Sequence, residues 1–273
     1  MPSHDGARLE LALEPELLRH LKSLAQRQGV TLFVVLLATF KSLLHRYSGQ
    51  TDIRVGGLIA NRTRSETEGL IGCFINTQVL RSEVTAQTRF VDLLNIVRDA
   101  STGAQAHQEL PFEQLVEALQ PQRSLSHSPL FQVMFNHQPV VADLLDKQLS
   151  GGLRVANLPA EQQALAQRSH AAASDLMLAT SGEGEQLHAT FTYATDIFDE
   201  STIARLAGHW RNLLASVCAD PLQTIAELSM LSADEHTQLL AVDSATKADT
   251  TTPAHRQFEA QVQRTPQAPA LIL

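Results

Sequence analysis

The sequence contains little cysteine and no excess of positive charge. Its two cysteines, Cys73 and Cys218, lie far apart and match no CxxC or metal-ligand spacing, so we expect neither a disulfide framework nor a metal site. Lys and Arg total 21 against 29 Asp and Glu, which gives a net charge of −8. Binding to nucleic acid through its phosphates needs clustered positive charge. These features favour a cytoplasmic protein without a nucleic-acid partner, in which both cysteines are small buried apolar groups.

Long hydrophobic runs and several familiar catalytic motifs are also missing. The most apolar stretch, Leu32 to Phe40, is far shorter than the roughly 20 residues of a membrane-spanning helix, so we expect no membrane partner. The N-terminus has no basic segment followed by an apolar stretch, so we expect no signal peptide. The sequence has no G-x-S-x-G, H-E-x-x-H, G-x-x-x-x-G-K-[ST] or G-x-G-x-x-G motif. The enzyme classes that depend on these motifs are therefore not expected.

Apolar residues at helical spacing predict five helices in the first 220 residues. They are expected over 14–28, over 32–47, after Thr88, after Pro111 and after Asp199. Thr31 is placed to cap the second helix, and Pro111 suits the first turn of the fourth. Asp199 is placed to cap the last helix, where Phe198 and Ile203 can form a hydrophobic staple. Trp210 lies on the apolar stripe of that helix, so we expect it to pack in the core or at the interface between lobes rather than to stack on a ligand.

Segments rich in Val, Ile, Leu and Phe predict strands between and after these helices. They are expected over 52–59, 71–80, 130–135, 175–179 and 187–193, with another near 153–158. The turn between the last two main strands is expected at residues 181–184. In the second strand, Asn76 and Gln78 are expected to share a face with Phe74 and Leu80. Together the strands and helices predict an α/β fold.

Four stretches resemble the second half of the condensation domains of nonribosomal peptide synthetases, in the order that the family uses. They are Arg46–Ile53 continuing to Arg62, Gly69–Arg81 with its Phe-Ile-Asn-Thr core, His107–Val116, and Arg123 with Ser126–Phe135. After a polar stretch at 244–253, residues 255–271 look like the start of an adenylation domain. That likeness accounts for the apolar residues 270–273 at the end of the chain.

The resemblance implies a fold and a set of partners. The chain would hold the C-terminal lobe, an α/β lobe similar to chloramphenicol acetyltransferase with a mixed β-sheet covered by helices. Residues 1–231 would form that lobe, 232–254 a linker between domains and 255–273 the truncated start of an adenylation domain. Expected partners are peptidyl carrier protein domains, the first lobe of the condensation domain and the adjacent adenylation domain. No cofactor is expected to bind directly, and the phosphopantetheine arms of the carrier proteins would enter from outside.

The histidine motif of this family is missing from the sequence. The family uses two adjacent histidines followed by three variable residues and Asp-Gly, on a loop of the first lobe, where a near-neutral imidazole can act as a base. None of the eleven histidines here is adjacent to another. We therefore assign no catalytic residue and expect the isolated chain to be inactive. It would be either part of an acyltransferase-type enzyme or a noncatalytic lobe that docks carrier proteins.

The resemblance also yields candidate site residues. Asn76, Thr77 and Gln78 are candidates for the lining of the substrate tunnel, because an amide on a strand facing a cleft can bind a thioester carbonyl or a pantetheine amide. The alternative for Asn76 is a structural role in which its side chain ties neighbouring backbone together. Asn61 and Arg62 are candidates for the interface with the first lobe. The alternative for Arg62 is a solvated surface side chain.

Overall fold

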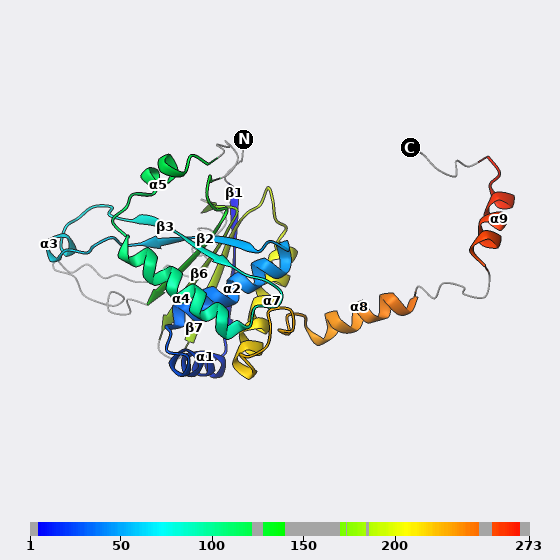
Figure 1. The fold of residues 1–273 in the computed structure, drawn as a ribbon, viewed down its shortest axis with the longest axis horizontal. Helices are drawn as coiled ribbons and strands as arrows, with labels where there is room; N and C mark the ends of the chain where they lie inside the picture. Colours follow the sequence, from blue (N-terminus) through cyan, green and yellow to red (C-terminus); the bar gives the residue numbers. More distant parts are fainter. Residues whose placement is uncertain are drawn as a thin grey trace, which may run out of the picture. The chain divides into compact units, whose positions relative to one another are not determined.

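The chain divides into two compact units, Met1–Met230 and Leu231–Leu273. The computed structural model describes residues 5–121, 128–139, 170–172, 174–183, 186–245 and 253–267. Within these residues the first unit consists of a β-sheet with helices packed on it (Figure 1). The second unit contains α8 (Ala233–Ala245) and α9 (Ala254–Arg264). The helix α8 thus occupies much of the region for which a linker is predicted.

The sheet is mixed and has seven strands in the order β3-β2-β4-β6-β7-β1-β5. The strands are β1 (Asp5–Leu13), β2 (Asp52–Ile59), β3 (Asn76–Glu83), β4 (Val133–Pro139), β5 (His170–Ala171), β6 (Leu176–Glu183) and β7 (Gln186–Ala194). The β2–β4 and β4–β6 pairs are parallel, and the remaining pairs are antiparallel. This arrangement is the predicted α/β fold with a mixed sheet.

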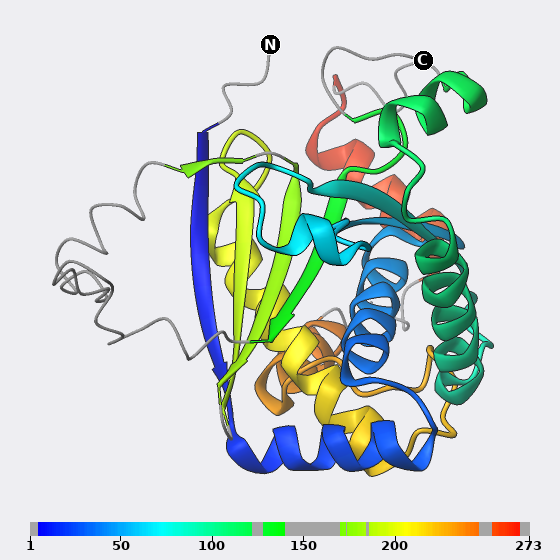
Figure 2. The ribbon, with the colours of Figure 1, turned by 90° about the vertical axis from the view of Figure 1, so that its left-hand side faces the viewer.

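Four helices form a layer against one face of the sheet (Figure 2). They are α1 (Pro15–Arg27), α2 (Leu32–Ser48), α4 (Phe90–Ala106) and α7 (Glu200–Ala219). The main hydrophobic core lies between this layer and the inward-facing strand residues such as Val55, Leu178 and Phe191. Helix α2 is apolar nearly all round and is the most enclosed of the four, because it packs against α1, α4, α7 and β2.

The opposite face of the sheet carries a smaller apolar cluster under α5 (Phe112–Leu119). Residues that alternate with the main core along the strands, such as Val79 and Met177, pack there with Phe131. The ring of Phe131 lies against the backbone of Gly56, where a Cβ atom would come within 2.4 Å of the ring. Glycine at this position therefore lets the Phe131 ring reach the sheet.

The five predicted helices are confirmed, and two details of their ends differ from expectation. The Thr31 hydroxyl accepts a hydrogen bond from the Val34 amide at 3.3 Å, as predicted for a cap. Asp199 occupies the cap position of α7, but its side chain makes no capping hydrogen bond. Pro111 is the residue before α5 rather than the first residue within it. Trp210 is fully buried in the core, as predicted.

The strands differ from the sequence prediction mainly in their ends. Strand β3 begins at Asn76, so the prediction of a strand from 71 is wrong for its first five residues, and Phe74 does not share the face of Asn76 and Gln78. Strand β4 begins at Val133 and continues to Pro139. Residues 181–183 belong to β6 rather than to a turn. The strand β1 was not predicted, although Leu9 and Leu11 alternate with the polar residues Arg8 and Glu10.

Some predictions cannot be compared with the structure or are wrong for individual side chains. The predicted strand near 153–158, the apolar residues 270–273 and most of the polar stretch at 244–253 lie outside the described residues. Cys73 is exposed, so the prediction that it is buried is wrong, because the segment around it lies outside the β-ladder. Cys218 is partly buried. No single described helix is long and apolar enough to cross a membrane; α1 and α2 meet that test only as a pair, bent by 104°.

The last residues of the first unit, 221–230, are held tightly, and we call them the exit segment. Arg46, at the end of α2, donates to the carbonyl oxygens of Ile225, Ala226 and Leu228 at 2.9, 3.1 and 3.1 Å. The amide of Ile225 donates to the Thr88 carbonyl at 2.9 Å. One arginine from the Arg46–Ile53 motif therefore fixes the path by which the chain leaves the lobe.

Candidate functional site

Arg62 contacts three other residues within the connection between β2 and β3. The guanidinium donates to the Thr67 carbonyl and, at 3.1 Å, to the Gly72 carbonyl. It also lies 4.4 Å from the centre of the Phe74 ring, which is a cation–π distance. These contacts hold the connection, which contains α3 (Ser65–Glu68), in a defined conformation although it is not part of the β-sheet. Arg62 is thus neither a freely solvated side chain nor bound to the sheet.

Large apolar side chains project to solvent from this connection. Leu70, Ile71 and Ile75 are exposed, and Ile71 is as exposed as in an extended peptide, at 104%. Asn61, at the start of the connection, has a positive φ of 49°, a conformation that asparagine tolerates better than most residues. Several neighbouring exposed apolar residues are typical of an interaction surface. We call Leu70, Ile71 and Ile75 the apolar loop.

The side chain of Asn76 uses all of its hydrogen-bonding groups on backbone. Its Nδ2 donates to the carbonyls of Gln108 and Leu110 at 3.0 and 2.8 Å. Its Oδ1 accepts from the amides of Thr77 and Phe112 at 2.9 and 3.3 Å. Asn76 therefore fastens the connection between α4 and α5 to the start of β3. In these contacts it behaves as the structural alternative describes.

The other two tunnel candidates lie on different faces of β3. Gln78 faces the helix layer, and its Nε2 donates to the Ala104 carbonyl in the last turn of α4. Thr77 alternates with Gln78 and so lies on the opposite face. The structure thus brings Asn76 and Gln78 together beside the end of α4, and separates Thr77 from them.

An open groove of about 840 Å³ runs along the connection between α4 and α5. Thr63 and the segment 105–111 line it together with Gln114. The Thr63 hydroxyl donates to the Glu109 carboxylate at 3.3 Å across this groove. The groove therefore lies along part of the His107–Val116 motif, and Asn76 donates to the carbonyls of two of its lining residues, Gln108 and Leu110.

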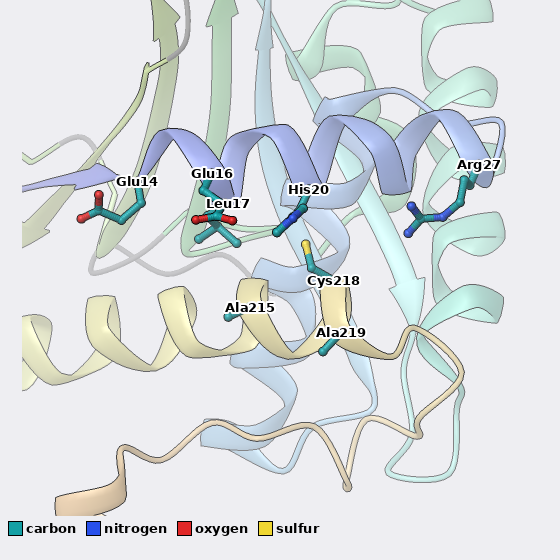
Figure 3. A pocket seen from close by; sticks show the side chains of 8 residues that line it. All are labelled: Glu14, Glu16, Leu17, His20, Arg27, Ala215, Cys218 and Ala219. Carbon is teal, nitrogen blue, oxygen red and sulfur yellow. The ribbon is translucent and has the colours of Figure 1, made fainter.

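A second groove, of about 460 Å³, lies between α1 and α7 and contains a thiol (Figure 3). Cys218 projects toward His20 in this groove. Burial raises the pKa of the Cys218 thiol to about 11, although the positive charge of Arg27 acts in the opposite direction. A thiol with this pKa is protonated near neutral pH and is a poor nucleophile. Cys218 is therefore not activated as a nucleophile near neutral pH.

Sequence reasoning missed an unusual buried lysine in α2. Lys41 is fully buried, and its Nζ donates to the Leu80 carbonyl at 2.8 Å and to the Ser82 hydroxyl at 2.6 Å. Desolvation lowers its pKa from 10.5 to about 7, and the charge of Asp52 opposes this shift. A single lysine at the end of an apolar helical run was the available signal. Lys41 ties α2 to the edge strand β3, on the face that carries Gln78.

Among the described residues, no group of three or more His, Cys, Asp or Glu side chains is arranged to hold a metal ion. The residues of β3 and of the two grooves can hold backbone segments in place and can offer neutral hydrogen-bonding groups. In the described part of these sites, the thiol of Cys218 beside His20 pairs a potential nucleophile with a potential base (Figure 3), and burial raises the pKa of that thiol to about 11.

Comparison with known proteins identifies the family. The family model described as "Condensation domain" matches residues 2–240. The chain is 43% identical over 272 residues to a linear gramicidin synthase of Brevibacillus parabrevis, covering 99% of this chain and 3% of that protein. It is 35% identical over 272 residues to tyrocidine synthase 2 of the same organism, covering 99% of this chain and 7% of that protein. The chain thus spans a small part of these curated relatives.

Solved structures share the fold. A four-domain nonribosomal peptide synthetase, holo-AB3403, superposes with a TM-score of 0.76 at 22% identity, over 86% of this chain and 18% of that one. The first condensation domain of the CDA synthetase superposes with a TM-score of 0.67 at 22% identity, over 84% of this chain and 48% of that one. The mixed sheet and its helix layer are therefore a condensation-domain fold, similar to chloramphenicol acetyltransferase. With the match over residues 2–240, these comparisons establish that the chain belongs to the condensation-domain family of nonribosomal peptide synthetases.

Proposed function

We propose that this chain is the C-terminal lobe of a condensation domain that joins two carrier-bound thioesters in a longer synthetase. The main support is that the family match extends over residues 2–240 while the chain covers 48% of a solved condensation domain. The four family-like motifs lie in the order expected for the second half. Residues 255–273 would begin an adenylation domain, and the enzyme would be cytoplasmic.

In the proposed reaction, the amine of an aminoacyl thioester attacks the carbonyl carbon of a second thioester. A carbon–nitrogen bond forms, the carbon–sulfur bond breaks, and the amine proton is passed through a base to the departing thiolate. The resemblance assigns the base to the paired histidines of the first lobe, and this sequence contains no such pair. This chain would contribute one wall of the tunnel that admits the phosphopantetheine arms of peptidyl carrier proteins.

The residues of the site take supporting roles in this proposal. Asn76, with four hydrogen bonds to backbone, would hold the α4–α5 connection beside the tunnel instead of touching substrate. Thr77 and Gln78 remain candidates for tunnel lining. Asn61 and Arg62 would shape the apolar loop, whose exposed side chains would be covered by the first lobe.

The alternative is a noncatalytic lobe that docks carrier proteins, and the missing histidine pair favours it for the chain on its own. The two are separated by supplying the upstream half of the condensation domain, with donor and acceptor carrier proteins loaded, and measuring peptide release. Product that disappears when the paired histidines of the added half are changed to alanine supports the enzyme. Persistent inactivity with intact carrier binding supports the docking lobe.

A further inference from the structure

A small cavity of about 120 Å³ lies between the helix layer and the sheet, at the end of the sheet where β2 and β4 finish. Its inner wall is apolar and is formed by Phe33, Leu80 and Phe135. The Phe33 and Phe135 rings pack against each other in this wall, with their centres 5.5 Å apart. The cavity is separate from the groove along the α4–α5 connection, and the described lining of the two shares only Gln105.

The rest of the lining is uncharged and includes the polar residues Gln78, Ser101, Gln105, Asn136 and His137. None of the described residues that line the cavity is an Asp, Glu, Lys or Arg. Burial lowers the pKa of His137 below its usual 6.5, so its imidazole is neutral at pH 7. Transfer of an ionised group into such a surrounding would be unfavourable because no charge is present to compensate it. The cavity therefore suits a neutral ligand.

One polar group of the lining has an unused hydrogen-bonding capacity. Ser101, on α4, is 8% exposed, and its Oγ has no hydrogen-bond partner in the described part of the chain. Buried hydroxyl groups are rarely left without partners in folded proteins. A ligand that hydrogen-bonds to Ser101 would remove this deficit.

Two further groups offer acceptors. The Thr180 hydroxyl donates to the Asn136 carbonyl at 3.4 Å, and it lies 2.9 Å from His137 Nδ1. In the neutral tautomer in which His137 Nδ1 donates to the Thr180 hydroxyl, the other ring nitrogen, Nε2, is an acceptor. Gln78 uses its Nε2 on the Ala104 carbonyl, which leaves Oε1 as an acceptor. The lining is thus richer in acceptors than in free donors.

We propose that this cavity is a binding site for a small neutral group that donates hydrogen bonds from a short apolar stem, such as a primary amide or an alcohol. The stem would contact the Phe33 and Phe135 rings, and the donor would reach Ser101, His137 and Gln78. Gln105, which is exposed, lies at the rim and leaves a way in from solvent.

The test uses propionamide as the probe and the whole 273-residue chain. Nuclear magnetic resonance would follow the Gly57 and Ser101 amides and the His137 ring during titration. We expect saturable shifts with propionamide, at least fivefold weaker binding of 2-butanone, which donates no hydrogen bond, and no saturable shift with propionate. Equal binding of propionate, or no saturable shift with propionamide, would overturn the proposal.

Two variants and a control define the site. Ser101→Leu fills the cavity and is expected to weaken propionamide binding at least tenfold, while Ser101→Ala removes only the hydroxyl and is expected to weaken it severalfold. Thr102→Leu, at the exposed neighbouring position, should leave binding unchanged. The fluorescence of the buried Trp210 reports whether each variant is folded. Undiminished binding by folded Ser101→Ala and Ser101→Leu would contradict the site.

The donor group could come from a free small molecule or from the side chain of an aminoacyl thioester, and only the second source rests on the proposed function. Asparaginyl-pantetheine and alanyl-pantetheine thioesters would compete against propionamide in the same titration. Displacement by the asparaginyl thioester alone identifies a substrate side chain as the source, and absence of displacement identifies a free molecule. Both results uphold the cavity as a site for this chemistry and are independent of peptide-bond formation.

Discussion

The buried amine of Lys41 makes the stability of the lobe depend on pH in a direction opposite to that of most ion-paired lysines. Its pKa is lowered from 10.5 to about 7 in the folded state. Between these values the unfolded chain binds more protons than the folded one, so the free energy of unfolding rises with pH. Below pH 7 both states are protonated and this slope vanishes. The full difference of 10.5 − 7 in pKa changes the free energy of unfolding by about 5 kcal/mol. About 2 kcal/mol of this change occurs between pH 7 and pH 9.

The assay is urea unfolding followed by the fluorescence of the single tryptophan, Trp210, which is fully buried. Lys41→Met nearly keeps the length of the side chain and removes the titrating amine. It should therefore abolish the rise in the free energy of unfolding between pH 7 and pH 9. Lys22→Met removes an exposed lysine and should keep the rise. The measured pH range ends at 9 because, above that pH, the raised pKa of Cys218 makes the free energy of unfolding fall as pH rises. Equal pH dependence of the wild type and Lys41→Met would refute the reasoning.

Three further substitutions test contacts in the fold and the site. Gly56→Ala places a methyl 2.4 Å from the Phe131 ring and should lower the free energy of unfolding by about 1–3 kcal/mol. The control Gly57→Ala, whose methyl would lie 3.6 Å from its nearest atom, should leave the free energy of unfolding nearly unchanged in the same urea assay. Arg46→Gln should speed amide hydrogen exchange at Ile225 and Ala226, because it removes donors to three carbonyls of the exit segment; unchanged exchange would count against the clamp. Asn76→Asp places a carboxylate against the carbonyls of Gln108 and Leu110 and should lower the free energy of unfolding by about 1–3 kcal/mol; a stability equal to that of the wild type would contradict the role of the Asn76 amide.

The helices and the α/β class could be predicted because each helix has a strong apolar stripe or an apolar core run. The ends of the strands were harder to predict. Arg62 donates to the Gly72 carbonyl in the segment before β3, which therefore does not join the β-ladder, and this contact is not visible in the local sequence. Strand β1 was missed because its short alternating pattern directly precedes a strong helix. Periodicity therefore located the elements more reliably than their limits.

The candidate site was predicted unevenly for a related reason. The polarity of Asn76 and Gln78 on a strand was visible in the sequence, but the partners of their amides come from residues about 30 positions away. The same holds for Lys41, whose acceptors lie on β3. Ser101 and His137 could not be predicted because a lone serine on a helix and a lone histidine after a strand have no local signature. Long-range contacts decide what these polar residues do.

The central claim is that this chain is one half of a condensing enzyme, and reconstitution tests it most directly. The chain would be combined with the upstream half of a condensation domain and with loaded donor and acceptor carrier proteins, and peptide formation would be measured by mass spectrometry. We predict product only when both halves are present, and its loss when the paired histidines of the added half are replaced by alanine. Product from this chain alone, or product that survives the histidine replacement, would contradict the claim.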